Sequence, residues 1–156
     1  KKLSVEEEIT LSIAESDPAS AVKMTQVITK HNPTIGLNIA KAVAATESVN
    51  VLRLHEVLKD TIPEKIIDVT RALITAQPEL ADELIQQLAQ WYPEQMVQMV
   101  IAIAHSLPEL RAEIISVLLK LAPEAVTKIK TDYAAMLVEE RQTIRPADRT
   151  PAVILR

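Results

Sequence analysis

Proline recurs in this sequence at intervals of fifteen residues or a multiple of fifteen. The series consists of Pro18, Pro33, Pro63, Pro78, Pro93, Pro108 and Pro123, and Ser48 occupies the one position of the series that lacks a proline. Proline is favoured in the first turn of an α-helix, because its missing N–H is not needed there and its fixed φ suits the helix. The series therefore predicts short helices, each of which begins at or near a proline.

The residues around the prolines support helix starts at these positions. Five of the prolines are followed by a glutamate, which places negative charge at the positive end of the helix dipole: Glu64, Glu79, Glu94, Glu109 and Glu124. Asp17 and Asn32 precede Pro18 and Pro33, and both residue types are typical N-caps. One continuous helix would cost about 3 kcal/mol for each interior proline. We therefore predict separate helices.

Dividing residues 3–137 into nine units of fifteen residues shows which face of each helix is buried. The seventh position holds Ile9, Met24, Ile39, Leu54, Val69, Leu84, Met99, Ile114 and Ile129. The eleventh position holds Ile13, Ile28, Val43, Leu58, Leu73, Leu88, Ile103, Leu118 and Tyr133. Apolar residues four positions apart form one face of a helix. Each unit is thus predicted to be an amphipathic helix of about 11 to 12 residues.

A second period of thirty residues is visible at the tenth and fourteenth positions. Odd-numbered units carry small residues there, namely Ser12, Ser16, Ala42, Thr46, Ala72, Ala76, Ala102 and Ser106, whereas most even-numbered units carry larger ones. Small residues allow two helix axes to approach closely. We therefore expect the odd helices to form one closely packed layer and the even helices a second layer.

These patterns predict an all-α protein with a right-handed α-solenoid-like array of short antiparallel helices. We expect about nine helices, fifteen residues per helix and a thirty-residue helical-hairpin repeat; a closed irregular helix bundle is the alternative. The architecture resembles helical-hairpin repeat proteins such as HEAT-like and tetratricopeptide arrays. The thirty-residue period and the Pro-Glu starts differ from the tetratricopeptide signature, so the resemblance implies no functional residue.

The array is expected to form a single domain over residues 3–137, followed by a tail over residues 138–156. The tail has a different composition, because it contains several arginines together with Pro146 and Pro151, which favour an extended course. The sequence begins with Lys1 and Lys2 and lacks an apolar signal segment. It is therefore interpreted as part of a larger protein.

The sequence contains no recognisable catalytic or cofactor motif. There is no cysteine, and Gly36 is the only glycine, so a thiolate metal site is excluded and a phosphate-binding loop is disfavoured. The histidines His31, His55 and His105 fall at three different positions of the unit, and Lys59 stands where a zinc helix motif beginning at His55 needs its second histidine. We predict a protein that is not an enzyme and binds neither metal nor cofactor.

Charge and hydropathy disfavour two further classes of partner. Residues 3–137 contain eleven basic and eighteen acidic residues, a balance of −7, which opposes binding to the phosphates of nucleic acid. The longest segment without a charge, residues 95–108, is too short to span a bilayer. The sequence therefore predicts a soluble protein, and it does not distinguish a cytoplasmic from a secreted one.

The seventh unit departs from the amphipathic pattern, because apolar residues surround most of its helix. Ile101 occupies a position that holds mainly polar residues in the other units. Together with Trp91, Tyr92, Met96 and Val97, it forms our candidate partner-binding surface. The alternative is that this helix is central in the array and covered by its neighbours or by the tail.

Two functions are consistent with these features. The first is a non-catalytic interaction module or scaffold that binds a protein or peptide partner, or a second copy of itself. The second is a carrier of a lipid or other apolar ligand in a cavity between the two helix layers. A cavity lined by Met99 and Ile103 would favour the carrier, whereas a filled core with Ile101 exposed would favour the interaction module.

Overall fold

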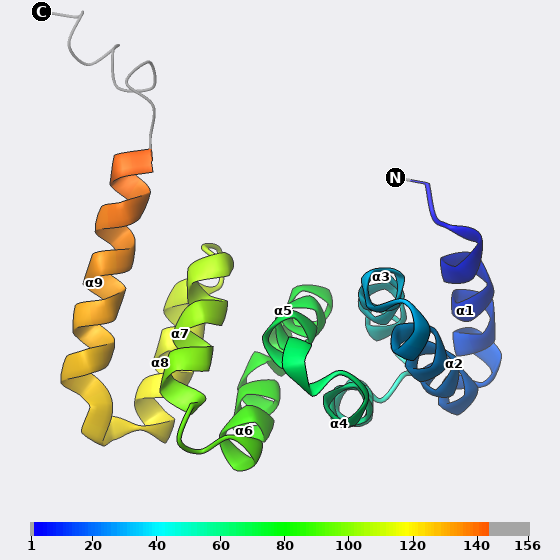
Figure 1. Cartoon of the computed structure of the whole chain (residues 1–156), viewed down its shortest axis with the longest axis horizontal. Coiled ribbons are helices and arrows are strands. Elements are labelled where there is room, and N and C mark those ends of the chain that lie inside the picture. The colour runs from blue at the N-terminus through cyan, green and yellow to red at the C-terminus, as the bar shows by residue number, and fades with distance from the viewer. Residues whose placement is uncertain (1, 144–156) are drawn as a thin grey trace, which may run out of the picture.

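The computed structural model describes residues 2–143, which form nine α-helices and no strand (Figure 1). The helices are α1 (Val5–Ser16), α2 (Pro18–His31), α3 (Pro33–Ala44), α4 (Val51–Thr61), α5 (Ile66–Ala76), α6 (Ala81–Trp91), α7 (Met96–Ser106), α8 (Arg111–Leu121) and α9 (Val126–Thr143). Short 3₁₀ turns precede three of them: η1 (Pro63–Lys65), η2 (Pro78–Leu80) and η3 (Pro123–Ala125). The predicted all-α class and the number of short helices are confirmed.

The prolines lie at helix starts or three residues before them, and two of them, Pro93 and Pro108, begin simple turns before α7 and α8. Pro18 and Pro33 are the first residues of α2 and α3, and the carboxylate of Asp17 and the amide oxygen of Asn32 cap these helices as predicted. Three later prolines instead begin the 3₁₀ turns, so that the α-helix starts three residues further on. No side chain caps these three turns, nor α5 and α6, which follow the first two of them, and a tighter first turn is a common form of such helix ends.

The unit that lacks a proline begins with a connection of its own. Asn50 caps α4 by accepting a hydrogen bond from the Arg53 N–H at 3.0 Å. Ser48 lies in the preceding loop, and its hydroxyl donates to the carbonyl of Ala14 near the end of α1, at 3.4 Å. A serine at this position thus links the loop after α3 to α1, which a proline could not do.

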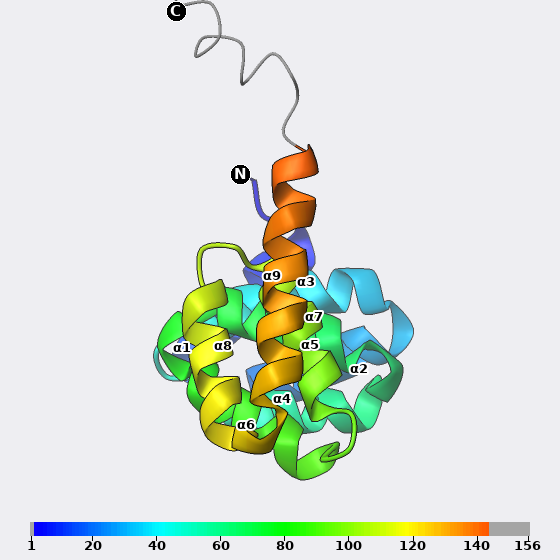
Figure 2. The same cartoon turned by 90° about the vertical axis from the view of Figure 1, so that its left-hand side faces the viewer.

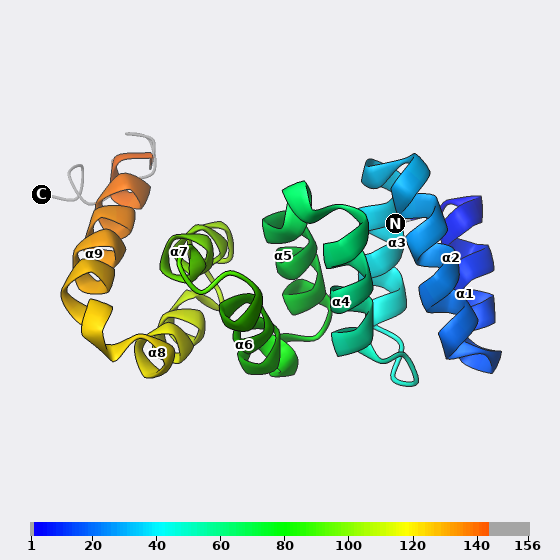
Figure 3. The same cartoon turned by 60° about the horizontal axis from the view of Figure 1, so that its bottom comes forward.

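The helices lie in two layers that run along the array. In one layer α1, α3, α5, α7 and α9 contact one another in succession, and in the other α2, α4, α6 and α8 do so. Figures 1 and 3 show α1 and α9 at opposite ends of this extended arrangement. Figure 2 views the molecule along the array from the α9 end. The predicted division into an odd and an even layer is confirmed.

The core lies between the layers and contains the two apolar positions identified from the sequence. The fully buried residues at these positions are Ile39, Leu54, Val69, Leu84, Ile114, Ile129, Val43, Leu58, Leu73, Leu88, Ile103 and Leu118. Burying one such side chain contributes roughly 1.5–3 kcal/mol. The first unit differs, because Ile9 is 49% exposed. The core is therefore continuous through the middle of the array and incomplete at α1.

The expected close packing of the tenth and fourteenth positions in the odd layer is wrong. At these positions Ser12, Ser16, Ala102 and Ser106 are exposed, and Ala42, Thr46, Ala72 and Ala76 are only half-buried. The buried small residues of the odd layer lie two positions earlier in the unit, at the eighth and twelfth positions: Thr10, Ala14, Ala40, Ala44, Thr70 and Ala104. Side-chain size alone indicated the alternation of the layers but not which face of the helix meets its neighbour.

Helix α9 is longer than the other helices and extends beyond the expected end of the array. It continues through Thr143, six residues past the boundary after Leu137. Most of its described side chains are exposed, and the helix contacts α7 and α8 only along one side. The remainder of the expected tail, residues 144–156, lies outside the described residues.

Candidate functional site

An open apolar groove of about 590 Å³ lies between α8 and α9 at the end of the array. It is lined by Ala112, Ile115, Ser116, Leu119, Lys120, Ile129, Lys130, Tyr133, Ala134 and Leu137. Ile115 and Ile129 are buried at its base, and Leu119, Tyr133 and Leu137 are half-buried. The groove thus offers a mainly apolar surface between two helices.

The groove corresponds to a place that another helix occupies elsewhere in the array. Ile115 and Leu119 of α8 have the same unit positions as His55 and Lys59 of α4. In α4 these residues contact the next even helix, α6: the His55 ring centre lies 4.8 Å from that of Trp91, and the Lys59 Nζ lies 4.8 Å from the Trp91 ring centre. Within residues 2–143 no even helix follows α8. The groove is therefore the unfilled equivalent of the α6 position on α4.

Two lysines give the groove a positive charge. Lys120 and Lys130 are exposed, and no carboxylate lines the groove beside them. Neither lysine forms an ion pair in the described part of the chain. Such a site attracts acidic groups, with an effect that weakens as salt is added.

Arg111 holds the helices that form the groove. It is 3% exposed, although its unit position elsewhere in the core is apolar or small: Ala21, Gly36, Val51, Ile66, Ala81 and Met96. Its Nε donates to the Ala104 carbonyl at 3.1 Å and its Nη2 to the His105 carbonyl at 3.0 Å. Both carbonyls lie in the last turn of α7, where carbonyls lack their usual partner four residues on; that of Ala104 also accepts from the Leu107 N–H at 3.3 Å. Nη2 also donates to Glu140 of α9.

The Arg111–Glu140 pair joins two charged groups. The hydrogen bond from Arg111 lowers the pKa of the Glu140 carboxyl below its ordinary value, and burial opposes this effect. The same hydrogen bond raises the pKa of the Arg111 guanidinium. Glu140 lies one helical turn beyond Leu137, which lines the groove. The pair thus fixes α9 next to the groove and connects it to α7 and α8.

Arg111→Met is expected to lower the free energy of unfolding by roughly 1–3 kcal/mol, because the His105 carbonyl of α7 loses its donor, the Ala104 carbonyl loses one of its two donors and Glu140 loses its ion pair with Arg111. Amide hydrogen exchange in α9 should accelerate as the helix loses its attachment, and mass spectrometry of peptic fragments measures this change. Arg53→Met is the control, because Arg53 forms an exposed ion pair with Glu56 at 3.0 Å and is expected to contribute less than about 0.5 kcal/mol. Unchanged exchange in α9 would contradict the role assigned to Arg111.

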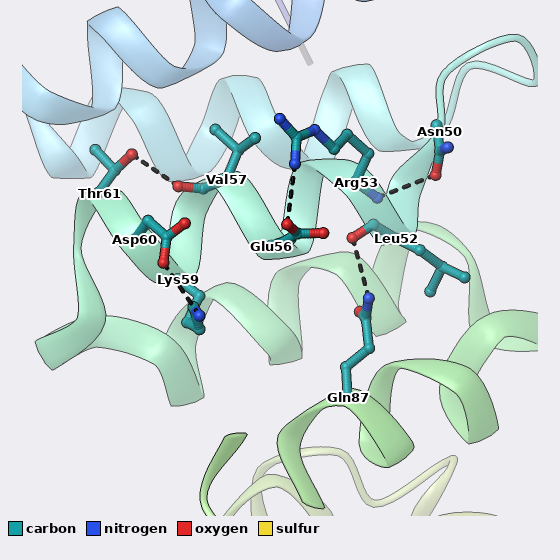
Figure 4. A network of polar contacts seen from close by, with 9 residues as sticks. All are labelled: Asn50, Leu52, Arg53, Glu56, Val57, Lys59, Asp60, Thr61 and Gln87. Atoms are coloured by element: carbon teal, nitrogen blue, oxygen red, sulfur yellow. Dashed lines mark hydrogen bonds and ion pairs between the residues drawn. The ribbon is translucent and has the colours of Figure 1, made fainter. Parts of the chain in front are cut away.

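A second polar cluster lies at the middle of the array, where α4, α5 and α6 meet. Figure 4 shows Gln87 of α6, whose Nε2 donates to the Leu52 carbonyl of α4 at 3.3 Å. The His55 ring, which is not drawn there, lies with Nδ1 2.7 Å from the Gln87 Oε1 and Nε2 2.7 Å from the Thr70 Oγ1. His55 is fully buried. The cluster links three helices across both layers.

The surroundings of His55 determine its protonation. Burial lowers its pKa to about 4, and the hydrogen bond with Gln87 opposes this effect only in part. The neutral ring at pH 7 carries its proton on Nδ1, because the Gln87 amide nitrogen faces Leu52 and its oxygen faces the ring. Nε2 is then an acceptor, and the single proton of the Thr70 hydroxyl is shared between Nε2 at 2.7 Å and the Ile66 carbonyl at 2.8 Å. With both nitrogens engaged in hydrogen bonds, His55 has a packing role.

Of the two predicted aromatic residues of the partner surface, Trp91 packs on this cluster and Tyr92 lies next to it in sequence. Trp91 is half-buried between His55 and Lys59. Tyr92 is also half-buried and lines a shallow cleft together with Trp91 and Pro63. Trp91 thus packs between two even helices, and one side of it borders the surface.

The other predicted site residues belong to α7. Met96 is buried at 7% exposure, while Val97 and Ile101 are half-buried and pack against the core. None of these three residues lines the groove between α8 and α9. The structure therefore does not bring the five predicted residues together with the groove. The groove itself was not predicted from the sequence.

Comparisons with known proteins do not identify a function. No protein-family model, curated protein or solved structure matches this chain. The described residues contain no group of three or more His, Cys, Asp or Glu side chains arranged to hold a metal ion. Within the same residues, no helix combines the length and the apolar character needed to cross a bilayer. The candidate site thus rests on the groove itself.

Proposed function

We propose that this chain is a non-catalytic, solenoid-like interaction module whose groove between α8 and α9 binds an amphipathic helix of a protein partner. The observation that carries the proposal is the unfilled helix position next to Ile115 and Leu119. In the array, the equivalent surface of α4 is covered by α6. A helix that binds there would bury apolar surface that now lies open to solvent.

The groove also indicates the chemistry of the bound helix. Its apolar base favours a helix with two apolar side chains one turn apart, which both face the groove. Lys120 and Lys130 favour carboxylates beside that apolar stripe. We therefore propose an acidic amphipathic helix as the ligand.

An apolar-ligand carrier is the alternative function. It has less support, because the residues expected to line its cavity do not line the groove. Such a cavity would be lined by Met99 and Ile103. Ile103 has no exposed surface, and neither residue lines the groove between α8 and α9. Ile101 is half-buried and not fully exposed, so the criterion for the interaction module is met only in part. The groove supports the interaction module independently of Ile101.

Selection of helical peptides from a displayed library tests this function. Peptides enriched on the wild-type protein should share apolar residues three or four positions apart and flanking acidic residues. Ala134→Glu, which places a carboxylate on an exposed position in the groove, should weaken their binding by more than tenfold, as measured by fluorescence anisotropy.

The matched control is Ala135→Glu, which changes the next residue of α9. Ala135 is also exposed but does not line the groove, so its variant should bind within about twofold of the wild type. Circular dichroism should show equal helix content in both variants. The proposal fails if no peptide is enriched, or if the enriched peptides bind equally to both variants.

A further inference from the structure

Helix α1, at the opposite end of the array, and Leu3, just before it, expose large apolar side chains. Val5 is 67% exposed, Ile9 49% and Leu3 40%. The unit position of Ile9 is fully buried in most of the other units. Neighbouring exposed apolar side chains of this size indicate a surface that another molecule covers.

The exposed residues of α1 other than its glutamates form one narrow stripe. At about 100° per residue, Val5, Ile9, Ser12 and Ser16 lie on the same side of the helix, and the buried Ala14 lies opposite. All four residues of the stripe are exposed. The two serines are small, so the axis of α1 can approach another helix closely.

The same stripe has the unit positions that one even helix presents to the next. In α6 the tenth and fourteenth positions are Gln87 and Trp91, and both contact His55 of α4. In α1 these two positions hold Ser12 and Ser16. The exposed face of α1 is therefore the equivalent of the face with which α6 covers α4.

Charge on α1 complements the charge of the groove. Glu8 and Glu15 are exposed along one edge of the apolar stripe, and Glu6 is exposed along the other. Lys120 and Lys130 are the charged residues that line the groove between α8 and α9. Opposite charges that meet across an interface select the partner and its orientation.

We propose that the groove between α8 and α9 binds α1 of a second copy of this chain, so that copies associate head to tail. The inference rests on the proposed function, in which the groove binds an acidic amphipathic helix. Here that helix is α1 of the second copy. The two contacting surfaces differ and lie at opposite ends of the array (Figure 1). The copy at one end of any such assembly therefore keeps a free α1 and the copy at the other end a free groove, so the association continues into linear chains.

The test measures mass against protein concentration by sedimentation equilibrium. The wild type should form species larger than a dimer at high concentration, and added salt should weaken them. Ile9→Glu blocks α1 and Ala134→Glu blocks the groove, so each variant alone should remain monomeric. An equimolar mixture of the two should form a dimer and nothing larger, because it contains one intact α1 and one intact groove for each pair.

Two controls keep the test specific. Val27→Glu changes a valine that is 48% exposed and Ala135→Glu an exposed alanine outside the groove, and both variants should associate like the wild type. A monomeric wild type at millimolar concentration would overturn the inference. So would association of either blocked variant alone, or a mixture that stays monomeric. Peptides that bind a monomeric wild type through the groove would overturn the second-copy partner and leave the proposed function standing.

Discussion

Gly36→Ala is expected to lower the free energy of unfolding by roughly 2–3 kcal/mol, although alanine is the better helix former. Gly36 is the only glycine of the chain and lies buried in α3 against α2. An added Cβ would lie closer than 3.0 Å to the Oγ1, Cα and Cβ atoms of Thr29. Because the Thr29 Cα belongs to the backbone, no side-chain rotation relieves the contact, and the two helices have to move apart.

Urea unfolding followed by circular dichroism measures this loss. Asn38→Ala changes an exposed residue of the same helix and should stay within about 0.5 kcal/mol of the wild type. Thr29→Ala, combined with Gly36→Ala, removes the Oγ1 but leaves the Cα and Cβ, so it should recover only part of the loss. Equal stabilities for Gly36→Ala and Asn38→Ala would show that the α2–α3 contact tolerates a Cβ.

Acidification from pH 7 to pH 4 is expected to remove up to about 3 kcal/mol of stability through His55 alone. Burial lowers its pKa from 6.5 to about 4 in the folded protein. Below pH 6.5 the unfolded chain therefore binds a proton that the folded chain does not yet accept, and the free energy of unfolding falls. Each pKa unit between the two values contributes about 1.36 kcal/mol, and the loss is complete below pH 4.

Urea unfolding at several pH values between 7 and 4 separates His55 from the other titrating groups. The stability of His55→Leu should fall less over this range than that of the wild type, because leucine cannot take up a proton. His31→Asn changes an exposed histidine and should retain the full wild-type loss. If His55→Leu and the wild type lose stability equally, the neutral buried ring does not govern the acid response.

The sequence predicted the helices well because their determinants are local. A proline near each start and apolar residues four apart identify a helix and its buried face without knowledge of its neighbours. The 3₁₀ turns after Pro63, Pro78 and Pro123 were not predicted, because the same residue type suits both kinds of first turn. The extension of α9 past Leu137 was missed because the fifteen-residue pattern ends there while helix formation does not.

The candidate site was harder to predict, because it depends on which helices are neighbours. Ile101 drew attention as an apolar residue at a mainly polar position, yet it is half-buried. Polar residues at mainly buried positions were more informative about contacts between helices. His55 and Arg111 are polar residues at positions that are buried in almost every other unit, and both join several helices. No residue in the sequence indicated the groove, because Ile115 and Leu119 have the apolar character of ordinary core residues. They differ only in that no helix of the described array covers them.

The position of Trp91 gives this protein a built-in local reporter. Trp91 is the only tryptophan of the chain, and it packs on His55 and Lys59 in the middle of the array. Each helix contacts mainly the one or two helices before and after it along the chain, so the two ends can open separately from the centre. Tryptophan fluorescence therefore follows the central contact between α4 and α6, while circular dichroism follows all nine helices. A difference between the two unfolding curves measures how far the ends of the array unfold before its middle.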